Sequence, residues 1–393
     1  MFTHFFHSSQ FHRILLVQPG TVRDIIRTLP IINILRLRFP HAKIAWLASP
    51  VMIDFLNSYN IADHLIVAKP GWYKKFCEIK TLRKKLRSFA PNLCLDLHGD
   101  LPSGFASKLS GSGKHLSVNG KKRRLFGRSK ITEYSEQPLE KCLKLLETLG
   151  VAGASIDYHL PEIPLERREA GWVLGNLGLE STPFAMLGVG VQSCSNYSAT
   201  IATSITGRSS GWDIDRYVQV AEHLWYTHNL PTVVTWQGAQ EKLIAEKIED
   251  ESGGMVALVP VNATSATTSA TPLSAIPFAV LARRTSVFVG TDNDFLHLAA
   301  AVGAPCIGVF CDENTRRNAP RCSNLHAIMA QAGGQRWKRR GVKTGAPPVR
   351  IDNYTYDVIQ VCNACDDILQ PEIAPAITVV VRAAQQQNQL VEI

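Results

Sequence analysis

The stretch RILLVQPGTVRDIIRTLP, residues 13–30, contains the unit from which the fold is built. Residues 13–17 have strand composition, a Pro-Gly turn follows, and the apolar residues after the turn recur at helical spacing. One carboxylate, Asp24, stands where the strand has ended and the helix begins. There it is a candidate general base for a hydroxyl nucleophile, and the alternative is an ordinary first-turn acid that stabilises the helix dipole.

The same strand-to-helix step recurs along the chain. In the first half we expect strands at 13–17, 43–48, 64–68 and 93–97, and helices at about 24–38, 51–58 and 74–88. In the second half we expect strands at 184–190, 231–236, 286–290 and 306–310, and helices near 165–177, 213–227, 239–250, 274–283 and 293–302. Strands that alternate with helices predict right-handed βαβ units and parallel sheets.

This alternation, over a chain too long for one ordinary core, predicts two domains. We expect an α/β fold of two Rossmann-like, doubly wound parallel-sheet domains that face each other across a cleft. The expected domains are residues 1–160 and 161–370, followed by a C-terminal helix, 371–393, that packs back on the body. Residues 195–210 and 261–272 are rich in Ser, Thr and Ala without periodicity, which is typical of flexible surface loops.

Composition and charge narrow the partners. The chain is 45% hydrophobic and 19% charged, with neither a long uncharged apolar run nor a secretory signal, so we expect a cytoplasmic protein. The net charge is +9, with basic clusters at 74–87, 120–130 and 336–343. The first is equally well explained as a solvated helix face, whereas the other two suit phosphate-bearing ligands or an anionic membrane surface. Nucleic acid is disfavoured because no nucleic-acid-binding motif accompanies these clusters.

The cysteines do not require a disulfide framework. Only CNAC, Cys362 to Cys365, has the spacing of metal ligands. A tetrahedral site would need two more ligands, for which Cys311 and Cys322 are the nearest candidates at an unusual spacing. Inert, partly buried thiols are the favoured interpretation, and a metal site is the alternative.

Residues 13–48 resemble the N-terminus of glycosyltransferase family 9, the ADP-heptose lipopolysaccharide heptosyltransferases. In that resemblance RDIIRTLP places Asp24 on the family's proposed catalytic base, and Arg23 stands where the family has Gly. Further segments are similar to the family's motifs in the family's order: LCLDLHGDLPSGFASKLSG (93–111), KCLKLLETLGV (141–151), TVVTWQGAQEKLIAEKI (232–248), VGTDNDFLHLAAAVGAPCIGVF (289–310) and CDDILQPEIAPAITVVV (365–381).

The resemblance implies a GT-B architecture with an N-terminal acceptor-binding domain and a C-terminal donor-binding domain. The resemblance also implies a set of donor-binding residues, some of which stand where this chain departs from the family pattern. They are Asp292, Asn293, Asp294, His297, Glu241, Arg208 and Trp212. The acceptor-binding candidates are Thr21, Arg23, Lys121, Lys122 and Arg123.

Local chemistry supports a donor site in the loop GTDND, 290–294, because a strand leads into a helix whose free N–H groups suit a diphosphate. There Asp292 would hold the loop or a sugar hydroxyl. His297 would reach a phosphate or ribose, and the alternative is a satisfied histidine packed between helix and sheet.

Two departures from the family pattern fall in the donor site. Asn293 and Asp294 replace a Thr-Gly pair, and a second carboxylate facing a diphosphate is unfavourable. Ser210 replaces the lysine that precedes the tryptophan, here Trp212, so Arg208 or Arg216 would have to supply the positive charge.

On this resemblance we expect an inverting glycosyltransferase that moves a heptose or similar sugar from an ADP-sugar donor to the lipopolysaccharide inner core, with Asp24 as base and without cofactor or metal. The expected partners are the donor, the core acceptor and the anionic inner-membrane surface, which the protein would meet peripherally from the cytoplasm. One alternative is a non-catalytic GT-B-fold descendant that binds glycan or protein. Another is a protein (autotransporter) heptosyltransferase with a cysteine-bound iron, in which CNAC would have a role.

Overall fold

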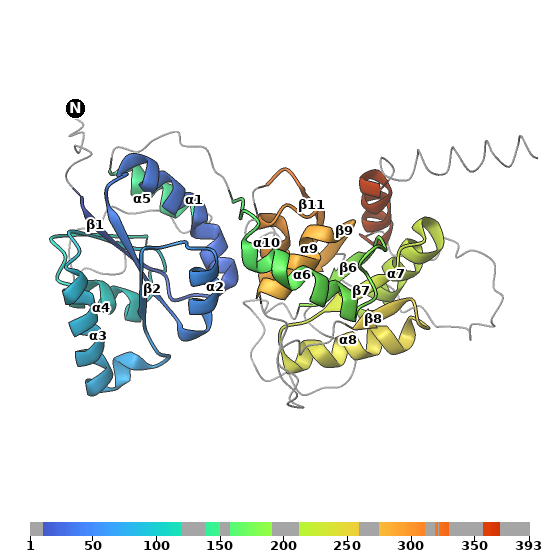
Figure 1. Cartoon of the computed structure of the whole chain (residues 1–393), viewed down its shortest axis with the longest axis horizontal. Helices are drawn as coiled ribbons and strands as arrows, with labels where there is room; N and C mark the ends of the chain where they lie inside the picture. The colour runs from blue at the N-terminus through green and yellow to red at the C-terminus, as the bar shows by residue number, and fades with distance from the viewer. Residues whose placement is uncertain are drawn as a thin grey trace, which may run out of the picture. The chain divides into compact units, whose positions relative to one another are not determined.

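The computed structural model describes residues 11–118, 138–149, 158–190, 212–258, 275–310, 319–320, 322–329 and 357–369. The chain divides into two compact units, Met1–Leu165 with Pro320–Cys322, and Glu166–Ala319 with Ser323–Ile393. Each unit is shown in Figure 1 and is considered by itself. The expected loops at 195–210 and 261–272 and the expected helix at 371–393 lie outside the described residues.

The first unit is built on five parallel strands in the order β3-β2-β1-β4-β5. The strands are β1 (Arg13–Val17), β2 (Lys43–Ala48), β3 (His64–Val67), β4 (Leu93–Asp96) and β5 (Lys114–Ser117). The helices are α1 (Val22–Arg38), η1 (Pro50–Met52), α2 (Ile53–Ser58), η2 (Trp72–Lys74), α3 (Phe76–Phe89), α4 (Leu101–Leu109) and α5 (Pro138–Glu147). The strand order reverses between β1 and β4, so the topological switch point lies at their carboxyl ends.

Apolar residues cover both faces of the central strand β1. Leu15 and Val17 pack in a core cluster with Leu82 and Leu86 of α3 and with Ala106 of α4. The alternate residues of β1, at 14 and 16, are also fully buried. A strand buried on both faces explains why ILLV, residues 14–17, is a continuous apolar run.

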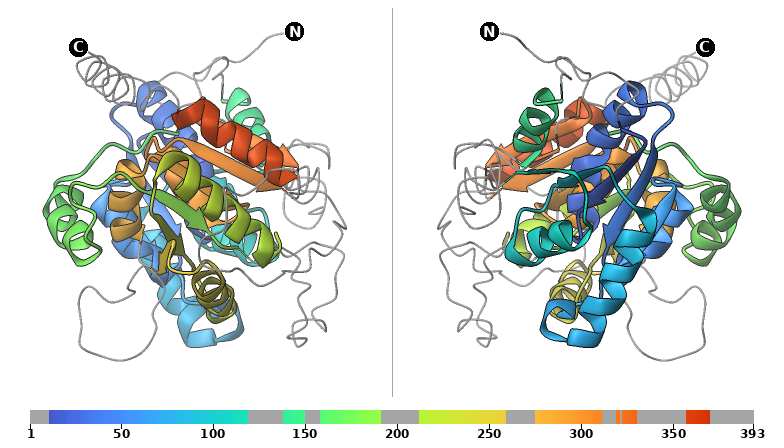
Figure 2. Two further views of the ribbon diagram at one scale, coloured as in Figure 1. Left: turned by 90° about the vertical axis from the view of Figure 1, so that its right-hand side faces the viewer. Right: turned by 90° about the vertical axis from the view of Figure 1, so that its left-hand side faces the viewer.

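The second unit has six parallel strands in the order β11-β10-β9-β6-β7-β8. The strands are β6 (Ala185–Gly188), β7 (Thr232–Thr235), β8 (Val256–Leu258), β9 (Val287–Thr291), β10 (Cys306–Phe310) and β11 (Leu325–Met329). The helices are α6 (Pro164–Asn176), α7 (Ile214–His228), α8 (Ala239–Glu251), α9 (Ala275–Arg284), α10 (Asp294–Ala301) and a last helix over 357–369, drawn in red in Figures 1 and 2. Here the order reverses between β6 and β9.

Two doubly wound parallel sheets confirm the predicted fold class. The sequence patterns predicted the buried strands and most of the described helices. They did not predict the strands β5, β8 and β11, nor the helices α4, α5 and 357–369. These strands are short and only partly buried, so they lack the clear two-residue alternation of a strand. The helix α4 begins Leu-Pro-Ser-Gly, which hides the helical repeat of apolar residues.

Candidate functional site

Asp24 lies in the first turn of α1, directly after the switch-point end of β1. The backbone N–H of Thr21, the N-cap residue, donates a hydrogen bond of 3.0 Å to Oδ2 of Asp24. The carboxylate is partly exposed, and it folds back against Gly20. A Cβ on Gly20 would lie 2.7 Å from the Cβ of Asp24, so the turn needs a glycine there. Asp24 therefore caps its helix and offers a partly exposed carboxylate at the switch point.

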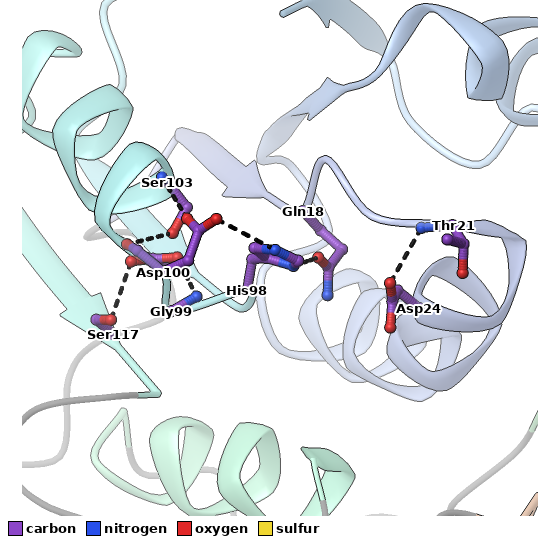
Figure 3. A network of polar contacts seen from close by, with 9 residues as sticks. Gln18, Thr21, Asp24, His98, Gly99, Asp100, Ser103 and Ser117 are labelled. Atoms are coloured by element: carbon purple, nitrogen blue, oxygen red, sulfur yellow. Dashed lines mark hydrogen bonds and ion pairs between the residues drawn. The ribbon is translucent and has the colours of Figure 1, made fainter. Parts of the chain in front are cut away.

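A second polar group follows the neighbouring strand β4. The ring Nδ1 of His98 lies 2.8 Å from Oε1 of Gln18, and its Nε2 lies 3.4 Å from Oδ2 of Asp100. Gln18 is buried directly after β1, and its backbone carbonyl accepts a hydrogen bond of 3.0 Å from Nε1 of Trp46. Figure 3 shows Gln18 between His98 and the turn that carries Asp24. Because β1 and β4 are adjacent and parallel, both groups lie at one edge of the sheet.

The side chain of Asp96, the last residue of β4, holds the loop that carries His98. Its buried carboxylate accepts hydrogen bonds from the N–H of Gly99 at 2.8 Å and from the hydroxyl of Ser117 at 3.0 Å. Gly99 has a φ of 78°, a left-handed conformation that favours glycine. Asp100 then caps α4 by accepting from the N–H of Ser103 at 2.7 Å. These contacts position His98 on a short, rigid connection.

None of the sequence motifs singled out Gln18, His98 or Asp100. Their position in the sequence could have pointed to them. Each follows β1 or β4, the two strands between which the strand order reverses. Of the acceptor-binding candidates, Thr21 contributes its N–H to Asp24, and Arg23 is a partly buried residue of the first turn of α1. Lys121, Lys122 and Arg123 lie outside the described residues.

In the second unit, Asn293 joins the loops that follow β6 and β9. Its Oδ1 accepts from the N–H of Leu296 at 2.9 Å and so caps α10, while its Nδ2 donates to the carbonyl of Val189 at 3.1 Å. Gly190 makes this approach possible, because a Cβ there would lie 2.9 Å from Nδ2 of Asn293. Asn293 therefore both caps α10 and holds the loop after β9 against the loop after β6.

His297 is buried completely and is paired with Asp292. Its Nε2 lies 3.1 Å from Oδ1 of Asp292, which is itself buried at the end of β9. In this conformation His297 can act on a ligand only through Asp292, which favours the interpretation of a packed histidine. Asp294 opens α10 and is partly exposed. A first-turn acid stabilises the positive end of a helix, and the same charge repels a diphosphate.

Glu241 also caps a helix. Its Oε2 accepts from the N–H groups of Gln237 at 2.6 Å and Gly238 at 3.2 Å, at the start of α8. Glu241 is partly exposed and lies in the first turn of α8, the helix that follows β7. Glu241, one of the donor-binding candidates, therefore shapes the turn that opens α8.

Trp212 and Arg216 converge on one buried carboxylate. Nε1 of Trp212 donates to Oδ2 of Asp357 at 2.8 Å, and Nη1 of Arg216 lies 2.6 Å from the same oxygen. Trp212 is only 2% exposed and packs edge-on against Tyr217. The charge of Arg216 is thus balanced within the core, and Arg208, the other candidate for the missing lysine, lies outside the described residues.

Cys362 and Cys365 are both buried on the helix 357–369. Burial raises the pKa of the Cys362 thiol to about 12 and also raises the pKa of Cys365. Protonated, core-packed thiols fit the favoured interpretation of inert cysteines. Cys322 is partly exposed, and Cys311 lies outside the described residues.

Among the helices that the structure describes, none combines the length and the hydropathy needed to cross a bilayer.

A family model described as glycosyltransferase family 9 (heptosyltransferase) matches residues 79–344 of this chain. The lipopolysaccharide core heptosyltransferase OpsX of Haemophilus influenzae is 22% identical over 326 residues, covering 80% of this chain and 83% of that protein.

Solved structures of the same family share the fold. The family 9 glycosyltransferase of Veillonella parvula superposes with a TM-score of 0.68 at 17% identity, over 92% of this chain and 98% of that one. E. coli ADP-heptose lipopolysaccharide heptosyltransferase II gives a TM-score of 0.63 at 15% identity, over 92% and 99% of the two chains. E. coli heptosyltransferase WaaC with ADP gives 0.59 at 16% identity, over 81% and 93%. These similarities identify the two parallel-sheet domains as a GT-B architecture.

Proposed function

Because the chain belongs to glycosyltransferase family 9, the heptosyltransferase family, we propose that it transfers a heptose from ADP-heptose to the lipopolysaccharide inner core. OpsX is named a lipopolysaccharide core heptosyltransferase, and WaaC has been solved with ADP and with ADP-2-deoxy-2-fluoro heptose. The nucleotide sugar is a substrate in this proposal, and no cofactor takes part.

The observation that carries the proposal is the position of Asp24. A partly exposed carboxylate follows β1 at the switch point and is held by the N–H of Thr21. In the proposed reaction this carboxylate takes the proton of the acceptor hydroxyl as the oxygen attacks the anomeric carbon. The bond from that carbon to the diphosphate oxygen breaks at the same time, and ADP leaves with the bonding electrons. A single displacement of this kind inverts the anomeric configuration.

The group formed by Gln18, His98 and Asp100 supports an acceptor site at the same sheet edge. His98 is partly exposed and has oxygen partners on both ring nitrogens, so the orientation of its ring is fixed. We assign it to the positioning of an acceptor hydroxyl or phosphate. A residue held in this way lowers the entropy cost of bringing the acceptor to the base.

The loop after β9 supports the donor side. Asp292 and Asn293 shape the entrance to α10, whose N-terminal N–H groups suit a diphosphate. Asp294 works against this, because its carboxylate occupies the same turn. We therefore expect weaker ADP binding than a Thr-Gly pair in this loop would give.

A surface of the first unit supports peripheral membrane binding from the cytoplasm. Phe76 and Leu101 are 70% and 78% exposed, and Phe105, which is also exposed, stacks on Trp72. Lysine side chains lie beside the aromatic rings, with Lys80 Nζ 4.6 Å from the ring centroid of Phe76. We call Tyr73, Lys74, Phe76, Lys80, Leu101 and Phe105 the aromatic-basic surface. Aromatic side chains next to lysines suit the interface of an anionic bilayer.

One observation favours a second function, a GT-B fold that binds glycan or protein without catalysis. Arg216, a candidate for the missing donor-binding lysine, is committed to Asp357 in the core. Together with the carboxylate of Asp294 this would leave the diphosphate poorly neutralised. Retention of Asp24 at the switch point favours the enzyme.

A titration followed by a turnover assay separates the two. Purified full-length protein is titrated by calorimetry with ADP, and UDP and GDP serve as controls. ADP-heptose is then incubated with truncated lipopolysaccharide, and the product is detected by mass spectrometry. Saturable binding that prefers ADP, with a heptose added to the acceptor, supports the transferase. If no nucleotide binds at millimolar concentration, the transferase is excluded and the binding function stands.

A further inference from the structure

Two histidines and one carboxylate meet at the end of α7. Nε2 of His223 and Nε2 of His228 each lie 2.7 Å from the same oxygen, Oδ1 of Asp366. These three ligand atoms all lie within 4.8 Å of one another. Neither the family resemblance nor the proposed reaction assigns any of these residues a role.

The group joins two elements that pack on each other. His223 and His228 belong to α7, and Asp366 belongs to the helix 357–369, which lies beside α7 in Figure 2. Residues of both helices share one apolar core cluster, including Ala221 and Leu224 of α7 with Val361 of the last helix. The group therefore lies where two helices are already held together, and its ligand atoms are preorganised.

We propose that His223, His228 and Asp366 form a binding site for a divalent transition metal of the Zn²⁺ class. Two neutral imidazoles and one carboxylate are a ligand set that suits zinc and its neighbours, with the fourth position left to solvent. The site has an open side for this fourth ligand, since the side chain of Asp366 is 29% exposed while that of His223 is 4% exposed.

The geometry requires little movement to accept an ion. Bonds of about 2.0 Å to a tetrahedral ion place neighbouring ligand atoms about 3.3 Å apart. The two histidine–carboxylate separations of 2.7 Å would therefore each lengthen by about half an ångström. The two rings already stand edge to face, at 75° with centroids 5.6 Å apart, so their nitrogens approach one point from different directions.

Thr227 provides the outer contact that histidine ligands usually have. Its hydroxyl lies 3.3 Å from Nδ1 of His223, on the side of the ring away from Asp366. When Nε2 binds a metal, Nδ1 carries the proton and donates it to this hydroxyl, which fixes the ring. A bound ion would act as a clasp that holds the helix 357–369 on α7 and stabilises the second unit.

The test uses untagged full-length protein stripped of metal with a chelator and titrated with Zn²⁺ alone. We expect one equivalent to bind with a dissociation constant in the micromolar range or below. A zinc excess of about a hundredfold over that constant should raise the melting temperature by about 5 °C or more. Asp366→Asn and His228→Gln should each weaken binding at least tenfold.

Two controls identify the ligands. His326→Gln removes an exposed histidine of β11, and Cys362→Ala with Cys365→Ala removes the nearby thiols; both variants should bind zinc as the wild type does. The Co²⁺ complex should show the visible bands of a tetrahedral ion without thiolate charge transfer. The proposal is overturned if no saturable binding occurs, if binding survives both ligand variants, or if the cobalt spectrum reports cysteine. None of these outcomes depends on glycosyl transfer.

Discussion

The carboxylate of Asp24 accepts a hydrogen bond of 3.0 Å from the backbone N–H of Thr21, three residues before it. This contact is that of a helix-capping acid, and it also fixes one oxygen of the carboxylate at the switch point of the first sheet. The capping and the catalytic interpretations of Asp24 are therefore compatible. They predict different turnover for a variant that loses the charge of Asp24 but keeps its hydrogen bond from Thr21.

Asp24→Asn makes that separation. The amide oxygen still accepts from Thr21, so we expect the melting temperature and ADP affinity to stay close to wild type. An amide cannot take a proton, so turnover should fall about 10²- to 10⁴-fold. Heptose transfer, calorimetry and thermal melts measure the three quantities. Asp54→Asn, in the first turn of α2, is the matched control and should keep its turnover. Near-normal turnover in Asp24→Asn would remove Asp24 from the chemistry.

His98→Ala should act on the acceptor. Loss of the ring that Gln18 and Asp100 hold in place should raise the KM for truncated lipopolysaccharide about tenfold, because about 1.4 kcal/mol of positioning or binding energy is lost. ADP affinity should not change. The control is His64→Ala, an exposed histidine at the amino end of β3. An unchanged KM for the acceptor, or an equal loss of ADP affinity, would contradict the assignment.

The sequence predicted the parts of the fold that are fully buried. ILLV in the strand β1 and CIGVF in the strand β10 are continuous apolar runs because both faces of these strands are buried. The half-exposed strands at the sheet edges, such as β11 with LHAIM, mix polar and apolar residues without a clear period. Their pairing depends on neighbouring strands that are distant in sequence.

The site residues also fall into two groups: those that a local sequence segment predicts, and those whose contacts join distant parts of the chain. Asp24 and the loop 292–294 could be found because each follows a strand within one local segment. The contact between Gln18 and His98 joins residues 80 positions apart, and only the pairing of β1 with β4 creates it. Arg216 was considered for the donor phosphates because its partner Asp357, 141 positions away, could not be inferred from the sequence.

Asp294→Asn should change stability and ligand affinity in opposite directions. Removing a first-turn charge from α10 should lower the free energy of unfolding by about 0.3–1 kcal/mol. The same change removes a repulsion, so ADP should bind about three- to tenfold more tightly. Denaturant melts and ADP titrations test both effects. Asp215→Asn, in the first turn of α7, should reproduce the loss of stability without the gain in affinity. Equal ADP affinity in both variants would place the diphosphate away from α10.

Asp63 gives the first unit a specific dependence on pH. Burial alone would raise the pKa of its carboxyl, but the N–H of Ile44 at 2.7 Å and the guanidinium of Arg36 at 2.9 Å outweigh it and hold the pKa below 3.8. A lowered folded-state pKa contributes stability above the unfolded pKa, and that stability is lost as the pH falls through the folded pKa.

Asp63→Asn should therefore cost about 1 kcal/mol at pH 7, and the cost should shrink below about pH 4. Urea melts of wild type and variant along a pH series measure the difference. Glu246→Gln, which breaks the exposed pair with Lys242, should cost little at any pH. A cost for Asp63→Asn that does not depend on pH would mean that the charge makes no net contribution.

Phe76→Ser tests the aromatic-basic surface. Phe76 is 70% exposed and carries a lysine ammonium over its ring, so it can enter a bilayer interface while the charge meets anionic headgroups. Losing the ring should weaken binding to phosphatidylglycerol-containing vesicles about tenfold, as expected for about 1.5 kcal/mol of apolar burial. Added salt should weaken it further. Leu37→Ser, at a residue of α1 that is 83% exposed, is the matched control and should bind as wild type does. If both variants bind equally, the membrane contact lies elsewhere on the chain.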